Sequence, residues 1–161
     1  MIKKEMTDAL NTQIVNEFYS SYLYLSMAAD LEEKGLKGFG NWMRKQSVEE
    51  IEHGMKIYDY IIVQGGKIRL SAIKAPKSSW KSPMEIFHGS YAHEKKVTAM
   101  IHNLRKLALK LDDNKTVRFL QWYVDEQVEE EENASGVIKK LKIAGNSRAM
   151  ILKLDSEMGR R

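Results

Sequence analysis

Glu50 and His53 stand three residues apart in the stretch SVEEIEHGMK, residues 47–56, which has the pattern of a helix. This spacing places a carboxylate and an imidazole on one helix face. Oxygen and imidazole ligands without a thiolate suit iron, manganese or zinc, and they do not suit a copper electron-transfer site. A single Glu-x-x-His is nevertheless a weak signal, because many helices carry the pair without a metal.

Three other predicted helices carry polar residues where a packed bundle needs apolar ones. Core positions recur at spacings of four and three along a helix. These series include Glu17 and Tyr24 on the first helix and Glu94 on the third. On the fourth helix the series is Val117, Leu120, Val124, Gln127, Glu131, Ala134 and Ile138, with Glu130 one step to the side. Each series is apolar or aromatic at its ends and polar in the middle.

Buried acids of this kind need a counter-charge. An ionised carboxylate buried without a partner costs several kcal/mol, and neighbouring acids raise one another's pKa. A total stability of about 5–15 kcal/mol does not support such a cluster unaided. A pair of bound cations resolves the conflict, and Glu residues from two helices with Glu-x-x-His from another follow the plan of di-iron carboxylate bundles.

The alternative for each residue taken alone is structural. A lone Glu on a core stripe is usually an edge residue, and the acidic run EQVEEEE, residues 126–132, is usually a solvated face. The metal interpretation is favoured because ligand types interrupt four helices at matching depth.

The elements that would position these residues are four long helices and a short fifth. The predicted ranges are about 7–34, 37–64, 82–114, 115–144 and 148–158. Ser82, Pro83 and Glu85 form a capping signal at the start of the third helix. Short links join the first two helices and the last two, whereas about 67–81 forms a long crossover. We therefore expect one all-α domain over 1–161, a ferritin-like four-helix bundle of about 5–144 with a short terminal helix of about 147–158.

The amino-acid composition indicates the compartment of the protein and the character of its surface. The chain of 161 residues has no cysteine, which excludes disulfides and thiolate sites and fits a reducing cytoplasm. We expect no signal peptide and no membrane span, because no long apolar run occurs. The net charge of +4 and pI of about 9.1 indicate a mixed solvated surface, while leaving a nucleic-acid or other polyanion contact open.

The residues resemble the prokaryotic non-haem ferritins over essentially the whole chain. The matching stretches are ALNTQIVNEFYSSYLYLSMA, GLKGFGNWMRKQSVEEIEHGMKIYDYI, GGKIRLSAIKAP, YAHE and FLQWYVDEQVEEE. The resemblance implies an iron-storage protein that oxidises Fe(II) with O2 or H2O2 and keeps Fe(III) as a mineral. It also implies a hollow homo-oligomeric shell of 24 subunits.

The resemblance further implies a ferroxidase centre for two iron ions in each subunit. Its implied ligands are Glu17, Glu50, His53, Glu94 and Glu130, with Glu50 as the bridge and Gln127 beside the second position. Tyr24 matches a tyrosine that can donate an electron, and Trp122 matches an aromatic neighbour. The positions that match a third iron site are Glu49, Glu126 and Glu129, which would share Glu130.

Two departures refine this expectation. Gln127-x-x-Glu130 stands where a second Glu-x-x-His would make the site symmetric, so the second iron should be held more loosely and leave after oxidation. Haem is not expected. The haem-containing ferritins resemble this fold but have a Met directly after the bridging Glu, where this chain has Ile51, and they keep the second-motif histidine, where this chain has Glu130. Ala149, Met150, Ile151 and Leu154 of the terminal helix match the lining of four-fold channels, although this helix could equally dock on its own bundle.

Two other classes of protein fit the same bundle. A rubrerythrin-like peroxidase usually adds an iron domain with four cysteines, which this chain lacks, and a di-iron oxygenase usually has a larger chain. A non-enzymatic bundle that binds metal or a polyanion is the remaining alternative.

Overall fold

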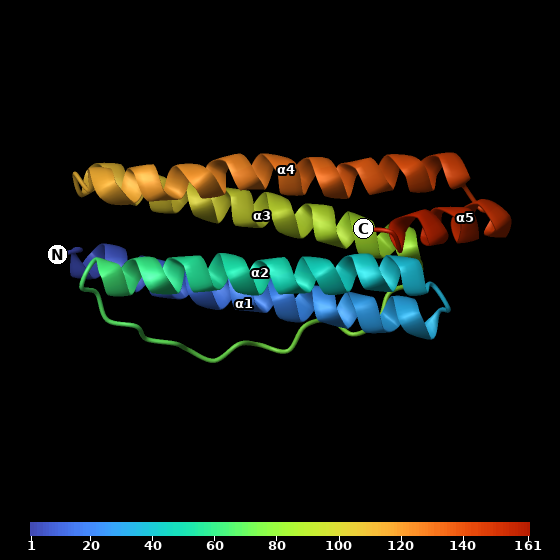
Figure 1. Ribbon diagram of the computed structural model, residues 1–161, viewed down its shortest axis with the longest axis horizontal. Helices are drawn as coiled ribbons and strands as arrows, with labels where there is room; N and C mark the ends of the chain where they lie inside the picture. The colour runs from blue at the N-terminus through green and yellow to red at the C-terminus, as the bar shows by residue number, and fades with distance from the viewer.

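The computed structural model describes all 161 residues as five α-helices without a strand (Figure 1). The helices are α1 (Lys4–Glu33), α2 (Lys37–Val63), α3 (Pro83–Lys110), α4 (Asn114–Ala144) and α5 (Arg148–Met158). The first four lie side by side as long rods, and the connection from α2 to α3 runs along the length of the bundle (Figure 1). This arrangement confirms the predicted all-α bundle with one crossover.

The helix ends follow local chemistry. Gly35 and Gly65, each two residues after the end of α1 or α2, have φ values of +77° and +73°, a backbone conformation that other residues rarely adopt. Ser82 Oγ accepts a hydrogen bond from Glu85 N at 3.2 Å, as expected for a cap of α3. The Glu85 carboxylate, however, accepts from Lys81 N at 2.7 Å. The reciprocal bond of the capping box therefore comes from the residue before the N-cap and not from Ser82 itself.

Two apolar cores lie along the bundle, with a polar layer between them. One contains Leu31, Phe39 and Phe87, and the other contains Leu10 and Ile57. On every long helix the two cores occupy opposite halves, so the residues midway along each helix form the layer that separates them. The prediction of apolar ends with a polar middle is therefore confirmed.

One expectation about α4 is wrong. The predicted core series contained Val124 and Glu131, but both are only half-buried, and Tyr123 and Glu130 take the buried positions. The Tyr123 hydroxyl donates to the carbonyl of His53 at 2.6 Å, which fixes the rotation of α4 against α2. Spacings of three and four allow a series to start on either of two adjacent residues, and this contact selects one of them.

The terminal helix α5 packs against α2 and α4 of its own bundle (Figure 1). Leu154 and Met158 are its buried residues. Phe39 N donates to Asp155 Oδ1 at 2.8 Å, so an α5 side chain caps the beginning of α2. Within this chain α5 therefore docks on its own bundle, which is one of the two arrangements that the sequence left open.

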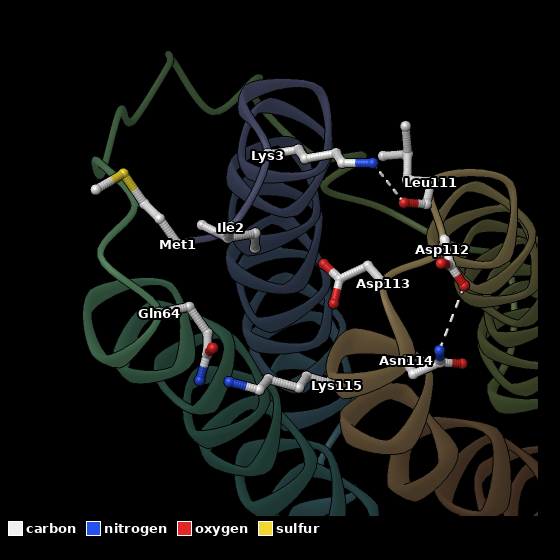
Figure 2. Close-up of a pocket in the computed structure, with 9 residues that line it drawn as sticks. All are labelled: Met1, Ile2, Lys3, Gln64, Leu111, Asp112, Asp113, Asn114 and Lys115. Carbon is white, nitrogen blue, oxygen red and sulfur yellow. Dashed lines mark hydrogen bonds between the residues drawn. The ribbon is translucent and has the colours of Figure 1, made fainter.

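The opposite end of the bundle joins the residues before α1 to the turn between α3 and α4 (Figure 2). Lys3 Nζ donates to Leu111 O at 2.6 Å, and Ile2 N donates to Gln64 O at 3.1 Å. Asp113 caps α4 by accepting from Thr116 N at 3.1 Å. In none of the five helices is there a stretch long and apolar enough to cross a bilayer.

Candidate metal centre

All four long helices contribute carboxylates to the polar layer. Glu17 comes from α1, Glu50 from α2, Glu94 from α3 and Glu130 from α4, with exposed fractions of 1%, 2%, 2% and 4%. Together with His53 and the half-buried Glu126 they form three groups of three residues, in each of which one ligand atom per residue lies within 4.8 Å of the others. These groups are Glu17–Glu50–His53, Glu50–Glu94–Glu130 and His53–Glu126–Glu130.

The neighbours that hold the carboxylates are neutral. Gln13 Nε2 donates to Glu17 Oε1 at 2.8 Å, and Gln46 Nε2 donates to Glu130. No lysine or arginine forms an ion pair with any of the four buried acids. Amide donors orient carboxylates without neutralising them, so the donor set fits a bound cation.

Glu94 has the most partners of the four acids. Tyr24, itself fully buried, donates its hydroxyl hydrogen to Glu94 Oε1. Gln127 Nε2 lies 3.1 Å from Glu94 Oε2 and 3.2 Å from Glu94 O. Gln127 therefore contacts the centre by donating its amide hydrogens to Glu94. Its amide oxygen takes no part in these bonds and is the atom of Gln127 that suits coordination of a cation.

Burial sets the electrostatics of the cluster. Desolvation raises the pKa of Glu17 to about 7, and desolvation followed by repulsion from Glu94 raises the pKa of Glu130 to about 8. Desolvation and the charges of Glu94 and Glu17 raise the pKa of Glu50 well above its usual value. A divalent cation would reverse these shifts by stabilising the ionised forms.

His53 is poised as a neutral ligand. Its Nδ1 lies 3.3 Å from Glu50 Oε2 and its Nε2 lies 3.8 Å from Glu126 Oε1. Burial lowers the pKa of His53 to about 4, so the imidazole carries a free lone pair at neutral pH. The Trp122 ring stands edge-on to it, with centroids 5.4 Å apart, where the sequence placed an aromatic neighbour.

The residues matched to a third iron site are only partly brought together. Glu126 joins His53 and Glu130 within 4.8 Å. Glu49 instead pairs with Arg161, whose Nη2 lies 2.7 Å from Glu49 Oε2. Glu129 is exposed and belongs to none of the three groups.

Sequence reasoning missed the residues that support the carboxylates. Gln13 precedes Glu17 by one helical turn, and that spacing is a signal which identifies it. Gln46 lies on the buried face of α2, and its bond to Glu130 crosses between helices. Arg161 had no local signal, because its partners Gln46 and Glu49 lie more than a hundred residues away in the chain.

Comparison with known proteins defines the class of the fold. A family model described as a ferritin-like domain matches residues 7–144. The structure superposes on an open pore ferritin from the archaeon Archaeoglobus fulgidus with a TM-score of 0.99 and 46% identity, covering 100% of this chain and 99% of that one. A structure described as a humanized archaeal ferritin gives a TM-score of 0.99 at 48% identity, with 100% and 99% coverage.

Relatives compared by sequence agree with this class. A bacterial non-heme ferritin of Bacteroides fragilis is 40% identical over 161 residues, 100% of both chains. One from Staphylococcus aureus is 35% identical over 161 residues, 100% of this chain and 97% of its own. The chain therefore belongs to the ferritin family, and the resemblance to the prokaryotic non-haem ferritins is confirmed. Membership of this family supports a function in iron storage.

Proposed function

We propose that the chain is a ferroxidase that oxidises Fe(II) with O2 or H2O2 and passes Fe(III) to a mineral store. The observation that carries the proposal is the convergence of four buried carboxylates and a neutral imidazole from four helices, with no cationic side chain among them. Oxygen and imidazole donors match the preference of iron. The proposed ligands of the two iron ions are Glu17, Glu50, His53, Glu94 and Glu130.

The geometry supports different roles for these side chains. Glu50 belongs both to the group with Glu17 and His53 and to the group with Glu94 and Glu130, which suits a bridge between two ions. The protein holds the ions side by side and excludes bulk water, while the iron supplies the electrons and the oxidant accepts them. We propose that Tyr24, whose hydroxyl donates to Glu94, supplies a further electron.

We propose that the second iron position releases its product. Its ligands are Glu50, Glu94 and Glu130, none of which is an imidazole, and Gln127 lies beside it. Glu126 groups with His53 and Glu130 and is the natural next ligand for an ion that leaves. Glu49 and Glu129 would join this third position only after side-chain movement. Glu49 is paired with Arg161, and Glu129 is exposed and belongs to none of the three groups.

We further propose that the whole chain, 1–161, is one ferritin-like unit of a homo-oligomeric shell of 24 copies in the cytoplasm. The α2–α3 connection is tied to α1 by Ser26 Oγ, which donates to Lys77 O at 2.7 Å. Tyr22 and Leu25 of α1 are about half exposed, as is Leu70 of the connection. Exposed apolar groups of this kind favour contact between copies.

The test is aerobic oxidation of Fe(II) by the purified protein, followed as ferric absorbance over many equivalents. Glu94→Ala removes a buried ligand, and Glu52→Ala removes an exposed acid of α2 as the matched control. We expect the parent and the control to keep far more iron soluble than the two ions per chain of the centre, and Glu94→Ala to be about a hundredfold slower. Uptake that stops near two ions per chain would instead indicate a fixed cofactor, as in a peroxidase, and would end the storage proposal.

A further inference from the structure

A series of three aromatic rings, which starts with Tyr24 itself, leads from the candidate metal centre to the outside of the bundle. Tyr24 is 0% exposed, and its ring lies edge-on to that of His93, with centroids 5.9 Å apart. The next ring is Tyr19, whose centroid lies 5.8 Å from that of His93. Tyr19 and His93 are both half-buried. The series therefore begins beside Glu94 and ends at the surface.

The outer end of this series opens into a pocket between α1, α3 and the α2–α3 connection. Tyr19 and His93 line the pocket, and its charged lining residues are Lys74 and Lys96, with no acid among them. Lys74 Nζ stands 4.8 Å from the centroid of Tyr19. Cationic groups around an aromatic floor favour a small anion with a flat, partly apolar body.

The position of His93 is fixed by a neighbour outside the candidate metal centre. Its Nε2 shares a hydrogen bond of 2.7 Å with Ser20 Oγ, which in turn bonds to Asn16 O at 3.1 Å. The imidazole is thereby held between the two tyrosine rings. The proposed ferroxidase chemistry leaves this arrangement of Tyr19, His93 and Ser20 unused.

We propose that this pocket binds a small anionic one-electron donor of the ascorbate class, and that Tyr19 and His93 carry an oxidising equivalent from Tyr24 to it. The inference rests on the proposed function, since oxidation of Tyr24 requires a working ferroxidase centre. Its consequence is a route by which the centre disposes of a damaging radical without exposing its buried carboxylates to solvent.

The electrons and protons balance along existing contacts. When Tyr24 gives one electron to the centre, its phenolic proton moves to the Glu94 carboxylate. Tyr19 then returns one electron to Tyr24 across the His93 ring, and Tyr24 recovers its proton from Glu94. Tyr19 loses its own proton to water and regains it when the bound anion gives one electron. The net change is the one-electron oxidation of the donor and the one-electron reduction of the centre.

The test follows the tyrosyl radical by electron paramagnetic resonance after Fe(II)-loaded, assembled protein is mixed with oxidant, with and without ascorbate. In the parent, ascorbate should quench the radical at a rate that saturates with its concentration. In Tyr19→Phe we expect quenching to be about tenfold slower. Tyr58→Phe, a half-buried tyrosine of α2 outside this series of rings, is the matched control and should behave as the parent.

A second pair of variants tests the pocket itself. Lys74→Gln with Lys96→Gln should raise the ascorbate concentration needed for half-maximal quenching several-fold, and added salt should do the same in the parent. Equal quenching in Tyr19→Phe and Tyr58→Phe, or the absence of any tyrosyl radical while Fe(II) is oxidised normally, overturns the relay. Failure to oxidise Fe(II) at all overturns the proposed function instead, so the two failures are distinguishable.

Discussion

Arg161 and Glu49 form an ion pair at the edge of the candidate metal centre, with Nη2 2.7 Å from Oε2. Nη1 of the same guanidinium donates to Gln46 Oε1 at 2.9 Å, and Gln46 in turn donates to Glu130. The guanidinium also lies over the ring of Trp42, 4.5 Å from its centroid. A guanidinium of the protein therefore pairs with Glu49, one of the carboxylates proposed for a third iron position.

Replacing this arginine should strengthen metal binding beside Glu126. In Arg161→Gln the Glu49 carboxylate loses its internal counter-ion, and a partly exposed pair of this kind is worth about 0.2–1 kcal/mol. We expect the most weakly bound Zn2+ ion to bind about twofold to fivefold more tightly in this variant than in the parent, as measured by calorimetry. Arg160→Gln removes the same charge from an exposed neighbour. Equal tightening in both variants would mean that net charge alone is responsible.

Removal of metal should make stability fall as the pH rises. The carboxyls of Glu17 and Glu130 have pKa values of about 7 and 8 in the fold against 4.5 in the unfolded chain. The folded state thus holds protons that the unfolded state has released, and the free energy of unfolding decreases between pH 4.5 and about 8. We expect the Tm of chelator-treated protein to drop by about 5 °C or more across this window.

The matched measurement uses Glu130→Gln, which stays neutral at every pH. Its Tm should depend less steeply on pH than that of the parent, because one of the buried carboxyls with a raised pKa is absent. Added Fe(II) or Zn2+ should remove most of the decline in the parent, since a cation stabilises the ionised carboxylates. A metal-free parent with a flat profile from pH 5 to 8 would contradict the electrostatic argument.

Supplying the second position with an imidazole should make it retain iron. Glu130→His gives that position a histidine one turn beyond Gln127, and nitrogen ligation should hold Fe(III) through a desalting step. We expect more iron bound per chain after desalting and an oxidation rate that declines about tenfold after the first equivalents. Glu129→His places the same imidazole on the exposed neighbour. If both variants release iron as the parent does, loose binding has a different cause.

The four-helix layout was predictable from the sequence, because it depends on local signals. Gly35, Gly65 and Ser82 mark helix ends through their own backbone or side-chain chemistry. The rotation of α4 was not predictable, because the Tyr123 hydroxyl finds its acceptor on α2, 70 residues earlier. Glu17, Glu50 and Glu94 stood out since they break an apolar pattern. The donor Gln13 can be recognised only through Glu17 one turn later, and the bond of Gln46 to Glu130 joins two helices far apart in the chain.

The docking of α5 depends on a glycine of α2. A Cβ on Gly38 would lie 1.7 Å from Asp155 O, so Gly38→Ala must push α5 away from α2. The variant should lose the bond from Phe39 N to Asp155 and expose Leu154 and Met158. We expect a loss of about 2–4 kcal/mol, measured by thermal unfolding, and cleavage of α5 by protease where the parent resists.

Gly136 of α4 provides the control for this prediction. A Cβ there meets no atom within 4 Å, and the residue lies in a helix interior. Gly136→Ala should therefore raise stability by about 0.5–1 kcal/mol, because alanine loses less backbone entropy on folding. The two alanine substitutions thus have opposite expected signs for the same change of side chain. A Gly38→Ala protein as stable and as protease-resistant as the parent would show that α5 does not need this close contact.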